Sequence, residues 1–160
     1  MPGKRLNVLM VCLGNICRSP LAESIFRAAN EAAGWSHVID SAGTAAYHVG
    51  KAPDPRSIRV ASEVSIDITR LKARQLSLND FTDFDHIFVM DDANLKHVLA
   101  MQPSDSHTVV SKVTTLLPRD SVNHGIDVPD PYYGGIDDFY AVLDLLKSTA
   151  RSWIAHCGSK

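Results

Sequence analysis

A thiol and a guanidinium stand six residues apart near the start of this sequence, at Cys12 and Arg18. Cys12 ends an apolar run, and Arg18 comes just before Ser19-Pro20, a pair typical of a helix N-terminus. A loop that enters a helix directs several backbone N–H groups and the positive end of the helix dipole at one point, where an anion binds. The same field stabilises a negatively charged sulfur, so Cys12 is predicted to be a reactive thiolate.

The residues between these two side chains fit a loop that wraps around a phosphate. Gly14 and Asn15 adopt left-handed backbone conformations at lower cost than other residues. The Arg18 guanidinium is a planar fork that holds two phosphoryl oxygens at once, which a lysine cannot do. A cysteine at a strand end is by itself more often a packed thiol, but this combination of residues favours a site. We therefore predict that Cys12 attacks a phosphate held by Leu13, Gly14, Asn15, Ile16, Cys17, Arg18 and Ser19.

Strands that alternate with helices are predicted to position this loop. The apolar run Leu6–Val11 has the composition of a strand buried on both faces, and apolar residues at helical spacing follow from Leu21 to Gly34. The same reasoning predicts further strands at Val38–Ile39, His86–Met90 and Thr108–Val110, and helices at Pro55–Val64, Asp91–Leu99 and Ile136–His156.

This order of elements predicts an α/β fold. We expect a single domain over residues 1–160, with an open parallel sheet of about four strands and helices on both faces, as in flavodoxin-like proteins. Ligands of such sheets bind outside the carboxyl ends of the strands, where the chain order reverses. The loop after the first strand is expected to lie there.

Composition excludes several classes of function. Charged residues make up 21% of the 160 positions, the formal net charge is −2, and lysines and arginines are scattered, so neither nucleic acid nor a membrane is an expected partner. Three cysteines, an odd number, argue against a disulfide framework and favour a reducing compartment, the cytoplasm. The histidines show no metal-ligand spacing. We expect no metal, no cofactor and a monomer.

The string Val11–Pro20 resembles the signature of the low-molecular-weight protein tyrosine phosphatases. The resemblance extends over nearly the whole chain, through Asp40–Thr44, Pro53–Arg56, Lys72–Gln75, Phe84–Ile87 with Met90-Asp91, and Asp130–Gly134. It implies metal-independent hydrolysis of phosphotyrosine in proteins, and of aryl phosphates generally, through a cysteinyl-phosphate.

The resemblance also implies roles for individual residues. Cys12 would be the nucleophile, Arg18 would bind the phosphate, and Asp130 would be the general acid that protonates the leaving group. From the residues alone, Asp130 stands in a segment of Asp, Pro and Gly that forms an ordinary turn equally well. The assignment of Asp130 therefore depends on the resemblance.

Other residues are implied to support the loop. Ser19 would donate a hydrogen bond to Cys12 as well as cap the helix, and Asn15 with Ser41 would fix the left-handed turn. Cys17 would protect Cys12 by forming a reversible disulfide. The family often has a histidine where this chain has Leu71, and this departure is expected to leave Asn15 short of one polar partner.

Three tyrosines, Tyr47, Tyr132 and Tyr133, are implied to form an aromatic rim around the substrate's phenyl ring. Surface tyrosines on loops are also common without any such role. Asp91 and Asp92 are expected to start a helix and not to contact substrate.

Three other functions are compatible with a phosphate loop. Arsenate reductases on the same fold need relay cysteines in the stretch that here runs from Leu71 to Leu95, which has none. Protein-arginine phosphatases resemble this chain but carry threonine at the position of Ile16, whose apolar side chain favours an aryl ring. A module that binds phosphopeptides without turnover would not need nucleophile, guanidinium and acid together.

Overall fold

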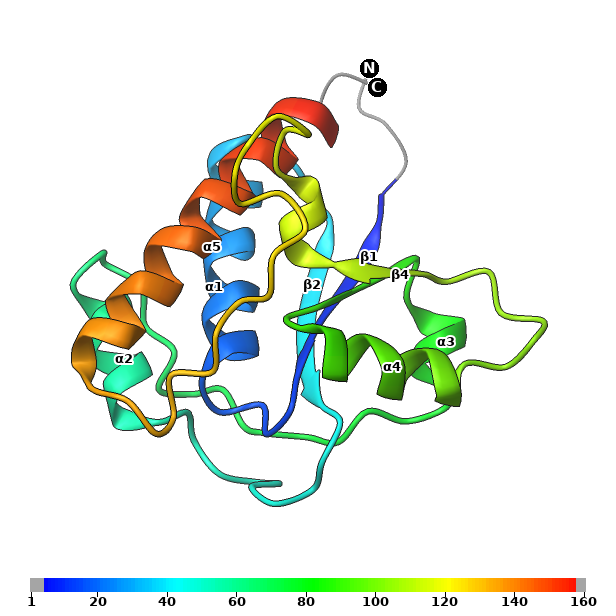
Figure 1. Cartoon of the computed structure of the whole chain (residues 1–160), viewed down its shortest axis with the longest axis horizontal. Helices are drawn as coiled ribbons and strands as arrows, with labels where there is room; N and C mark the ends of the chain where they lie inside the picture. The colour runs from blue at the N-terminus through cyan, green and yellow to red at the C-terminus, as the bar shows by residue number, and fades with distance from the viewer. Residues whose placement is uncertain (1–4, 158–160) are drawn as a thin grey trace.

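A parallel sheet of four strands, covered by helices on both faces, organises residues 5–157, the part of the chain that the computed structural model describes (Figure 1). The predicted α/β class is confirmed. The elements follow one another as β1 (Asn7–Cys12), α1 (Arg18–Ala32), β2 (Val38–Gly43), α2 (Pro55–Ser62), α3 (Asp80–Asp83), β3 (His86–Val89), α4 (Asp92–Met101), β4 (Val109–Lys112), the 3-10 helix η1 (Val113–Leu116) and α5 (Ile136–Cys157).

The strands lie in the order β2-β1-β3-β4, so the chain leaves β1 on one side for β2 and returns to its other side for β3. The order therefore reverses at β1. The loop that follows Cys12 lies at the carboxyl end of the sheet at this reversal, which is where ligands of open parallel sheets bind. The position expected of this loop is confirmed.

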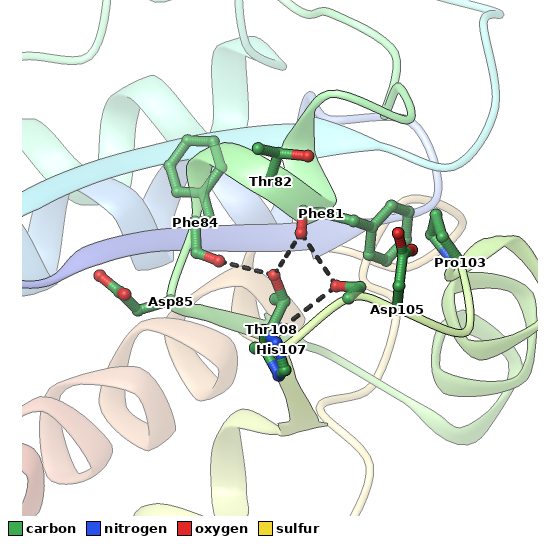
Figure 2. Close-up of a pocket in the computed structure, with 9 residues that line it drawn as sticks. Phe81, Thr82, Phe84, Asp85, Pro103, Asp105, His107 and Thr108 are labelled. Atoms are coloured by element: carbon green, nitrogen blue, oxygen red, sulfur yellow. Dashed lines mark hydrogen bonds between the residues drawn. The ribbon is translucent and has the colours of Figure 1, made fainter.

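The opposite end of the sheet, at the amino ends of β3 and β4, carries a cavity of about 350 Å³ (Figure 2). The Thr108 hydroxyl lies 2.9 Å from the Phe81 carbonyl oxygen and 2.7 Å from that of Phe84. The Ser106 hydroxyl also donates to Phe81, at 2.9 Å. Both hydroxyls therefore donate to backbone carbonyls in the wall of the cavity. The cavity lies away from the residues predicted to do chemistry.

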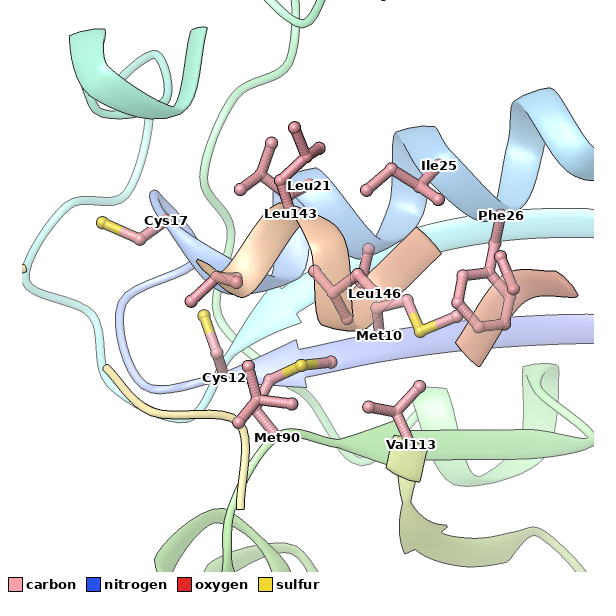
Figure 3. Packing of buried hydrophobic residues seen from close by; sticks show 14 of the residues in the cluster. Met10, Cys12, Cys17, Leu21, Ile25, Phe26, Met90, Val113, Leu143 and Leu146 are labelled. Atoms are coloured by element: carbon pink, nitrogen blue, oxygen red, sulfur yellow. The ribbon is translucent and has the colours of Figure 1, made fainter. Parts of the chain in front are cut away.

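Alternate residues of β1 face opposite sides of the sheet, as the period of a strand requires. Met10 packs in the buried cluster that includes Phe26 of α1 and residues of α5 (Figure 3). Leu9 packs in a second cluster with Val98 of α4. Burying a side chain of this size stabilises the fold by about 1.5–3 kcal/mol, and a slip of one residue would exchange the two faces. The packing on both faces therefore fixes the register of β1, which places Cys12 at the carboxyl end of the strand.

Strand β2 is longer than the sequence predicts. It runs to Gly43 instead of ending at Ile39, because the intervening residues continue to pair with β1 as far as Gly43 opposite Cys12. Two elements, α3 and η1, are not predicted, since four residues are too few to show a helical period. The other predicted boundaries lie within three residues of the observed ones.

The predicted capping of α1 by Ser19 is wrong. The helix begins at Arg18, and its N-cap is Cys17, which makes no side-chain capping hydrogen bond. Ser19 therefore stands inside the first turn, with its hydroxyl available for another partner. The expectation for the start of α4 is confirmed: Asp91 is its N-cap and accepts a hydrogen bond from the Asn94 backbone N–H.

Candidate active site

Cys12, the last residue of β1, opens the segment that we call the thiol loop, residues 12–18. The loop is held against the chain that leaves β2, because Thr44 N–H donates to the Cys12 carbonyl and Ala45 N–H to the Leu13 carbonyl, both at 2.9 Å. Gly43 lies directly beneath it. A Cβ atom at Gly43 would come within 2.7 Å of the Leu13 carbonyl oxygen, so only glycine permits this close approach.

Two hydrogen bonds are directed at the Cys12 sulfur. The Asn15 backbone N–H donates to Sγ at 3.3 Å, and this geometry depends on the left-handed conformation of Asn15, whose φ is 57°. The Ser19 hydroxyl lies 3.0 Å from Sγ. Cys12 is 3% exposed. A buried sulfur with these contacts is held in the orientation that a nucleophile needs.

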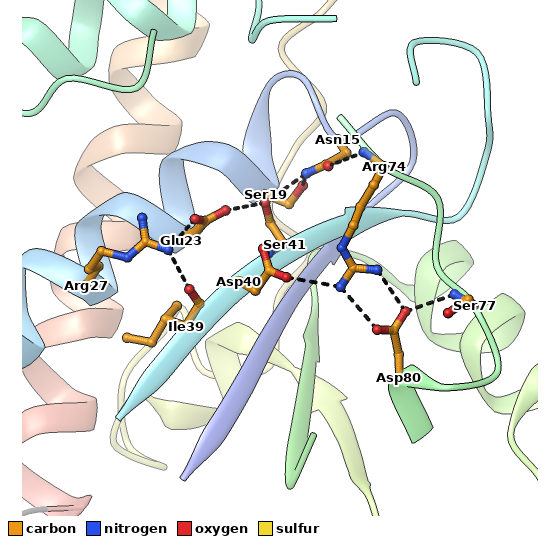
Figure 4. A network of polar contacts seen from close by, with 10 residues as sticks. All are labelled: Asn15, Ser19, Glu23, Arg27, Ile39, Asp40, Ser41, Arg74, Ser77 and Asp80. Atoms are coloured by element: carbon orange, nitrogen blue, oxygen red, sulfur yellow. Dashed lines mark hydrogen bonds and ion pairs between the residues drawn. The ribbon is translucent and has the colours of Figure 1, made fainter. Parts of the chain in front are cut away.

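The Asn15 side chain connects Ser19 to a wider polar network and sets the direction of its hydroxyl (Figure 4). Its amide nitrogen donates to the Ser19 hydroxyl at 2.8 Å and to the Ser41 hydroxyl at 3.0 Å. Since that nitrogen can only donate, both hydroxyl oxygens accept, and each hydroxyl hydrogen must go elsewhere. The Ser19 hydrogen is therefore directed at Cys12 Sγ, and that of Ser41 at the Glu23 carboxylate, 2.5 Å away.

The partner expected to be missing because of Leu71 is supplied by the backbone. The Arg74 N–H donates to Asn15 Oδ1 at 3.0 Å, which also fixes the orientation of the amide. The Arg74 side chain is held in turn by ion pairs with Asp80 and Asp40. Leu71 packs against the hydrophobic core instead. The Asn15 side chain is thus hydrogen-bonded through both its nitrogen and its oxygen.

Glu23 forms the far end of this network and is 3% exposed. It accepts hydrogen bonds from Ser41 and from Arg27, whose Nη2 lies 2.5 Å from Oε2. Burial raises the pKa of the Glu23 carboxyl above its ordinary value, and the Ser41 and Arg27 contacts offset only part of that effect. No motif or spacing in the sequence predicts that Glu23 belongs to the site.

Arg18 is 2% exposed, and its guanidinium is fixed by protein acceptors. Nη1 donates to Asp91 Oδ2 at 2.7 Å and to the Val128 carbonyl at 2.9 Å. Burial alone would lower the pKa of Arg18, but the neighbouring Cys12 and the hydrogen-bonded Asp91 outweigh it, and the pKa is raised. Asp91 therefore does more than start α4, because it also orients the predicted phosphate-binding group.

Asp130 lies on the segment before α5 that we call the Asp130 loop, residues 128–135. Its Oδ2 is 3.7 Å from Arg18 Nη2, and the side chain is 38% exposed. Its Oδ1 accepts a hydrogen bond from the Tyr132 N–H at 3.1 Å. The structure thus brings the predicted acid together with the guanidinium of the thiol loop from two distant parts of the chain.

The three tyrosines predicted to form the rim are linked by ring contacts that include one further residue. Tyr132 and Tyr133 are in edge-on contact, with ring centroids 5.0 Å apart. The His48 ring lies between Tyr47 and Tyr132, at 6.4 and 6.2 Å, and covers Gly14 of the thiol loop. His48 was not predicted. No periodic or motif signal marks it, and it reaches the site only because the chain folds back after β2.

Cys17 lies at the base of the thiol loop and is 5% exposed. Burial raises the pKa of its thiol to about 12, and the negative charge of Asp54 acts in the same direction. Cys12 and Cys17 are both free thiols. At neutral pH Cys17 is therefore a protonated, packed thiol, in contrast to Cys12 with its two hydrogen-bond donors.

Among residues 5–157, no three histidine, cysteine, aspartate or glutamate side chains are grouped so as to hold a metal ion. Over the same residues no helix is both long enough and apolar enough to cross a membrane.

Comparison with known proteins matches residues 7–160 to the family described as low molecular weight phosphotyrosine protein phosphatase. A phosphatase of that name from Schizosaccharomyces pombe is 45% identical over 141 residues, which cover 85% of this chain and 86% of that protein.

Solved structures agree. A protein tyrosine phosphatase from Entamoeba histolytica superposes with a TM-score of 0.88 at 32% identity, covering 96% of this chain and 97% of the other. An arginine phosphatase from Drosophila has a TM-score of 0.84 at 28% identity, covering 94% and 96% of the two chains. Sequence, fold and site geometry lead to one conclusion: the chain belongs to the low molecular weight phosphotyrosine protein phosphatase family.

Proposed function

We propose that this protein hydrolyses phosphotyrosine in proteins, and aryl phosphate monoesters generally, through a cysteinyl-phosphate intermediate. The observation that carries the proposal is the Cys12 sulfur, which receives the Asn15 N–H and the Ser19 hydroxyl and lies in the loop that ends at the buried Arg18. A nucleophile and an oxyanion-binding group are thereby preorganised in one loop.

In the first step, Cys12 Sγ attacks phosphorus. The S–P bond forms, the P–O bond to the aryl group breaks, and its electron pair stays on the aryl oxygen. Asp130 supplies a proton to that oxygen, while Arg18 and the N–H groups at the start of α1 stabilise the phosphoryl oxygens. The product is a phenol and a cysteinyl-phosphate.

In the second step, the Asp130 carboxylate takes a proton from water, whose oxygen attacks phosphorus. The S–P bond breaks and inorganic phosphate leaves. The sulfur departs as a thiolate, which the Ser19 hydroxyl stabilises because the Asn15 amide directs its hydrogen there. Every group in the cycle comes from the chain, so we expect full turnover in the presence of a chelator.

Substrate choice separates this proposal from its closest rival. The structural similarity to an arginine phosphatase makes phosphoarginine the second candidate. Ile16, where such phosphatases resemble this chain but carry threonine, is 9% exposed and packs in the core cluster. The aromatic rim of Tyr47, Tyr132 and Tyr133 supports an aryl substrate. Phosphotyrosine, phosphoserine and phosphoarginine peptides assayed side by side decide between them, and a preference for phosphoarginine would reverse the proposal.

The chemistry is tested with Cys12→Ser and Asp130→Ala. We expect Cys12→Ser to lose turnover of p-nitrophenyl phosphate while still binding phosphate. Asp130→Ala should lower kcat/KM by roughly 10²–10⁴-fold for phenols that are poor leaving groups, and less for activated ones. Full activity in Cys12→Ser would refute the nucleophile, and an unchanged leaving-group dependence in Asp130→Ala would refute the acid.

We further propose that Cys17 protects Cys12. Peroxide oxidises Cys12 to a sulfenic acid, and the Cys17 thiol condenses with it, releasing water and forming a disulfide that a thiol reductant opens. Because the pKa of Cys17 is raised to about 12, the condensation is expected to be slow. After peroxide treatment, dithiothreitol should restore activity in the parent and not in Cys17→Ala.

The setting of the enzyme is also proposed. The mechanism needs a reduced Cys12, which supports a reducing compartment such as the cytoplasm. We propose that residues 1–160 act as one monomeric domain whose partners are phosphotyrosine-containing proteins. Sedimentation of the full chain tests the monomer.

A further inference from the structure

Arg56 of α2 spans the distance between the two loops of the active site. Its Nη1 donates to the Gly134 carbonyl and its Nη2 to the Tyr132 carbonyl, both at 2.9 Å, so the guanidinium holds two points of the Asp130 loop. On its other side it binds Asp54 through Nε at 3.0 Å and through Nη2 at 2.9 Å.

Asp54 in turn is attached to the thiol loop. Its backbone N–H donates to the Ile16 carbonyl at 2.8 Å. It is also the N-cap of α2, accepting the Arg56 backbone N–H at 2.8 Å, and it is 8% exposed. Asp54 is therefore held rigidly against the thiol loop, and the Arg56 side chain extends from it toward the Asp130 loop.

The contact with Tyr132 reaches Asp130 itself. The Tyr132 carbonyl accepts from Arg56, and the Tyr132 N–H donates to Asp130 Oδ1 at 3.1 Å. Both groups belong to Tyr132, so the hydrogen bonds to its carbonyl restrain the residue whose N–H binds Asp130. The guanidinium is further held 4.4 Å over the ring of Phe139, a fully buried residue of α5.

We propose that Arg56 is a positioning residue that keeps Asp130 in place relative to the thiol loop, so that its proton reaches the leaving oxygen. The inference rests on the proposed function, because it assumes that Asp130 is the acid. A misplacement of about 1 Å can cost a factor on the order of 10² in rate. The guanidinium fork is needed because a single ammonium could not bind both carbonyls and the carboxylate in one plane.

The same helix offers a matched control. Arg59 lies one turn further along α2, its side chain is 64% exposed, and its ion pair is with Glu63 of the same region, at 3.9 Å. An Arg59→Ala variant removes an arginine from the same helix without touching either loop.

The test is kcat/KM for aryl phosphates whose phenols range from acidic to basic. We expect Arg56→Ala to lower kcat/KM by about 10- to 100-fold for the most basic phenol and by much less for the most acidic one. Arg59→Ala should match the parent throughout. In the Asp130→Ala background, Arg56→Ala should add little, because the group on which it acts is already gone.

A purely structural role for Arg56 would lower kcat/KM by one factor for all leaving groups, and that factor would multiply with the effect of Asp130→Ala. Either result overturns the inference. Arg56→Lys keeps a cation beside Asp54, so it should fold even where Arg56→Ala does not. We expect it to show the same change in leaving-group dependence as Arg56→Ala, but a smaller one. If Arg56→Lys had the same leaving-group dependence as the parent, the inference would also be overturned. The single variant Asp130→Ala separates failure of this inference from failure of the proposed function. If Asp130 were not the acid, Asp130→Ala would leave the leaving-group dependence unchanged.

Discussion

The thiol loop and the rim of the site are built in opposite ways. In the thiol loop, Asn15 and Arg18 are almost fully buried and hydrogen-bonded to groups from several elements. In the rim, Tyr47 is 74% and Tyr133 is 92% exposed, and each ring makes an edge-on contact, Tyr47 with His48 and Tyr133 with Tyr132. The loop proposed to bind phosphate is therefore preorganised, whereas the tyrosines proposed to contact the rest of the substrate are exposed to solvent. Chemistry and recognition should respond differently to substitution.

Among the substitutions that compare these two regions, Arg18→Lys is expected to have the largest effect. A lysine keeps the charge but cannot reach Asp91, the Val128 carbonyl and two phosphoryl oxygens at once, so kcat/KM for aryl phosphates should fall by roughly 10²–10³-fold. Steady-state kinetics and inhibition by phosphate measure the loss. Arg151→Lys, on the exposed side of α5, is the control. A fall below tenfold would mean that the thiol loop tolerates change as the rim does.

A smaller effect is expected from the rim. Removing the ring in Tyr132→Ala or Tyr133→Ala should raise KM for a phosphotyrosine peptide by roughly 2- to 10-fold, the size of one aromatic contact, with kcat nearly unchanged. Tyr133→Phe keeps the ring and should behave like the parent. If either alanine variant lost kcat as severely as Arg18→Lys, the rim would belong to the chemistry and the contrast would disappear.

The smallest effect concerns the buried end of the network, at Glu23. Because burial raises the pKa of this carboxyl, the folded protein holds its proton more tightly than the unfolded chain does. Its contribution to stability is present at low pH and is lost as the pH rises through the folded-state pKa. In Glu23→Gln this loss is absent, so the free energy of unfolding of the variant relative to the parent should rise with pH over that window.

Urea unfolding from mildly acidic to neutral pH measures this difference. Glu31→Gln, an exposed position of the same helix, serves as the control. A constant offset between parent and Glu23→Gln, or one that falls as the pH rises, would show that burial does not govern the titration of Glu23.

Local signals in the sequence were enough for the thiol loop and the sheet. The run before Cys12 and the helix that follows Arg18 are encoded within a few residues, and strand-helix alternation determines where such a loop lies. The predicted cap at Ser19 is wrong because the helix begins earlier, at Arg18, so Ser19 lies inside the first turn, where its hydroxyl contacts Cys12 Sγ.

The supporting contacts could not be predicted in the same way. Arg18 meets Asp91 across 73 positions, and Arg56 meets Gly134 across 78. Nothing local distinguishes Asp91 as a partner of Arg18 from Asp91 as an ordinary helix cap, because it performs both roles. These two pairs form only when the chain has folded. The sequence pattern therefore marks the segments that contain Arg18, Asp91 and Arg56 but does not predict which residues contact one another.

Gly43 carries no functional group, yet the shape of the thiol loop depends on it. Any side chain at this position would press on the Leu13 carbonyl from below and tilt the loop as a whole. In a library of random variants, position 43 should therefore be as intolerant as the nucleophile itself. Such data would therefore mark a position that has no reactive group, because the backbone of the neighbouring strand determines the shape of the loop.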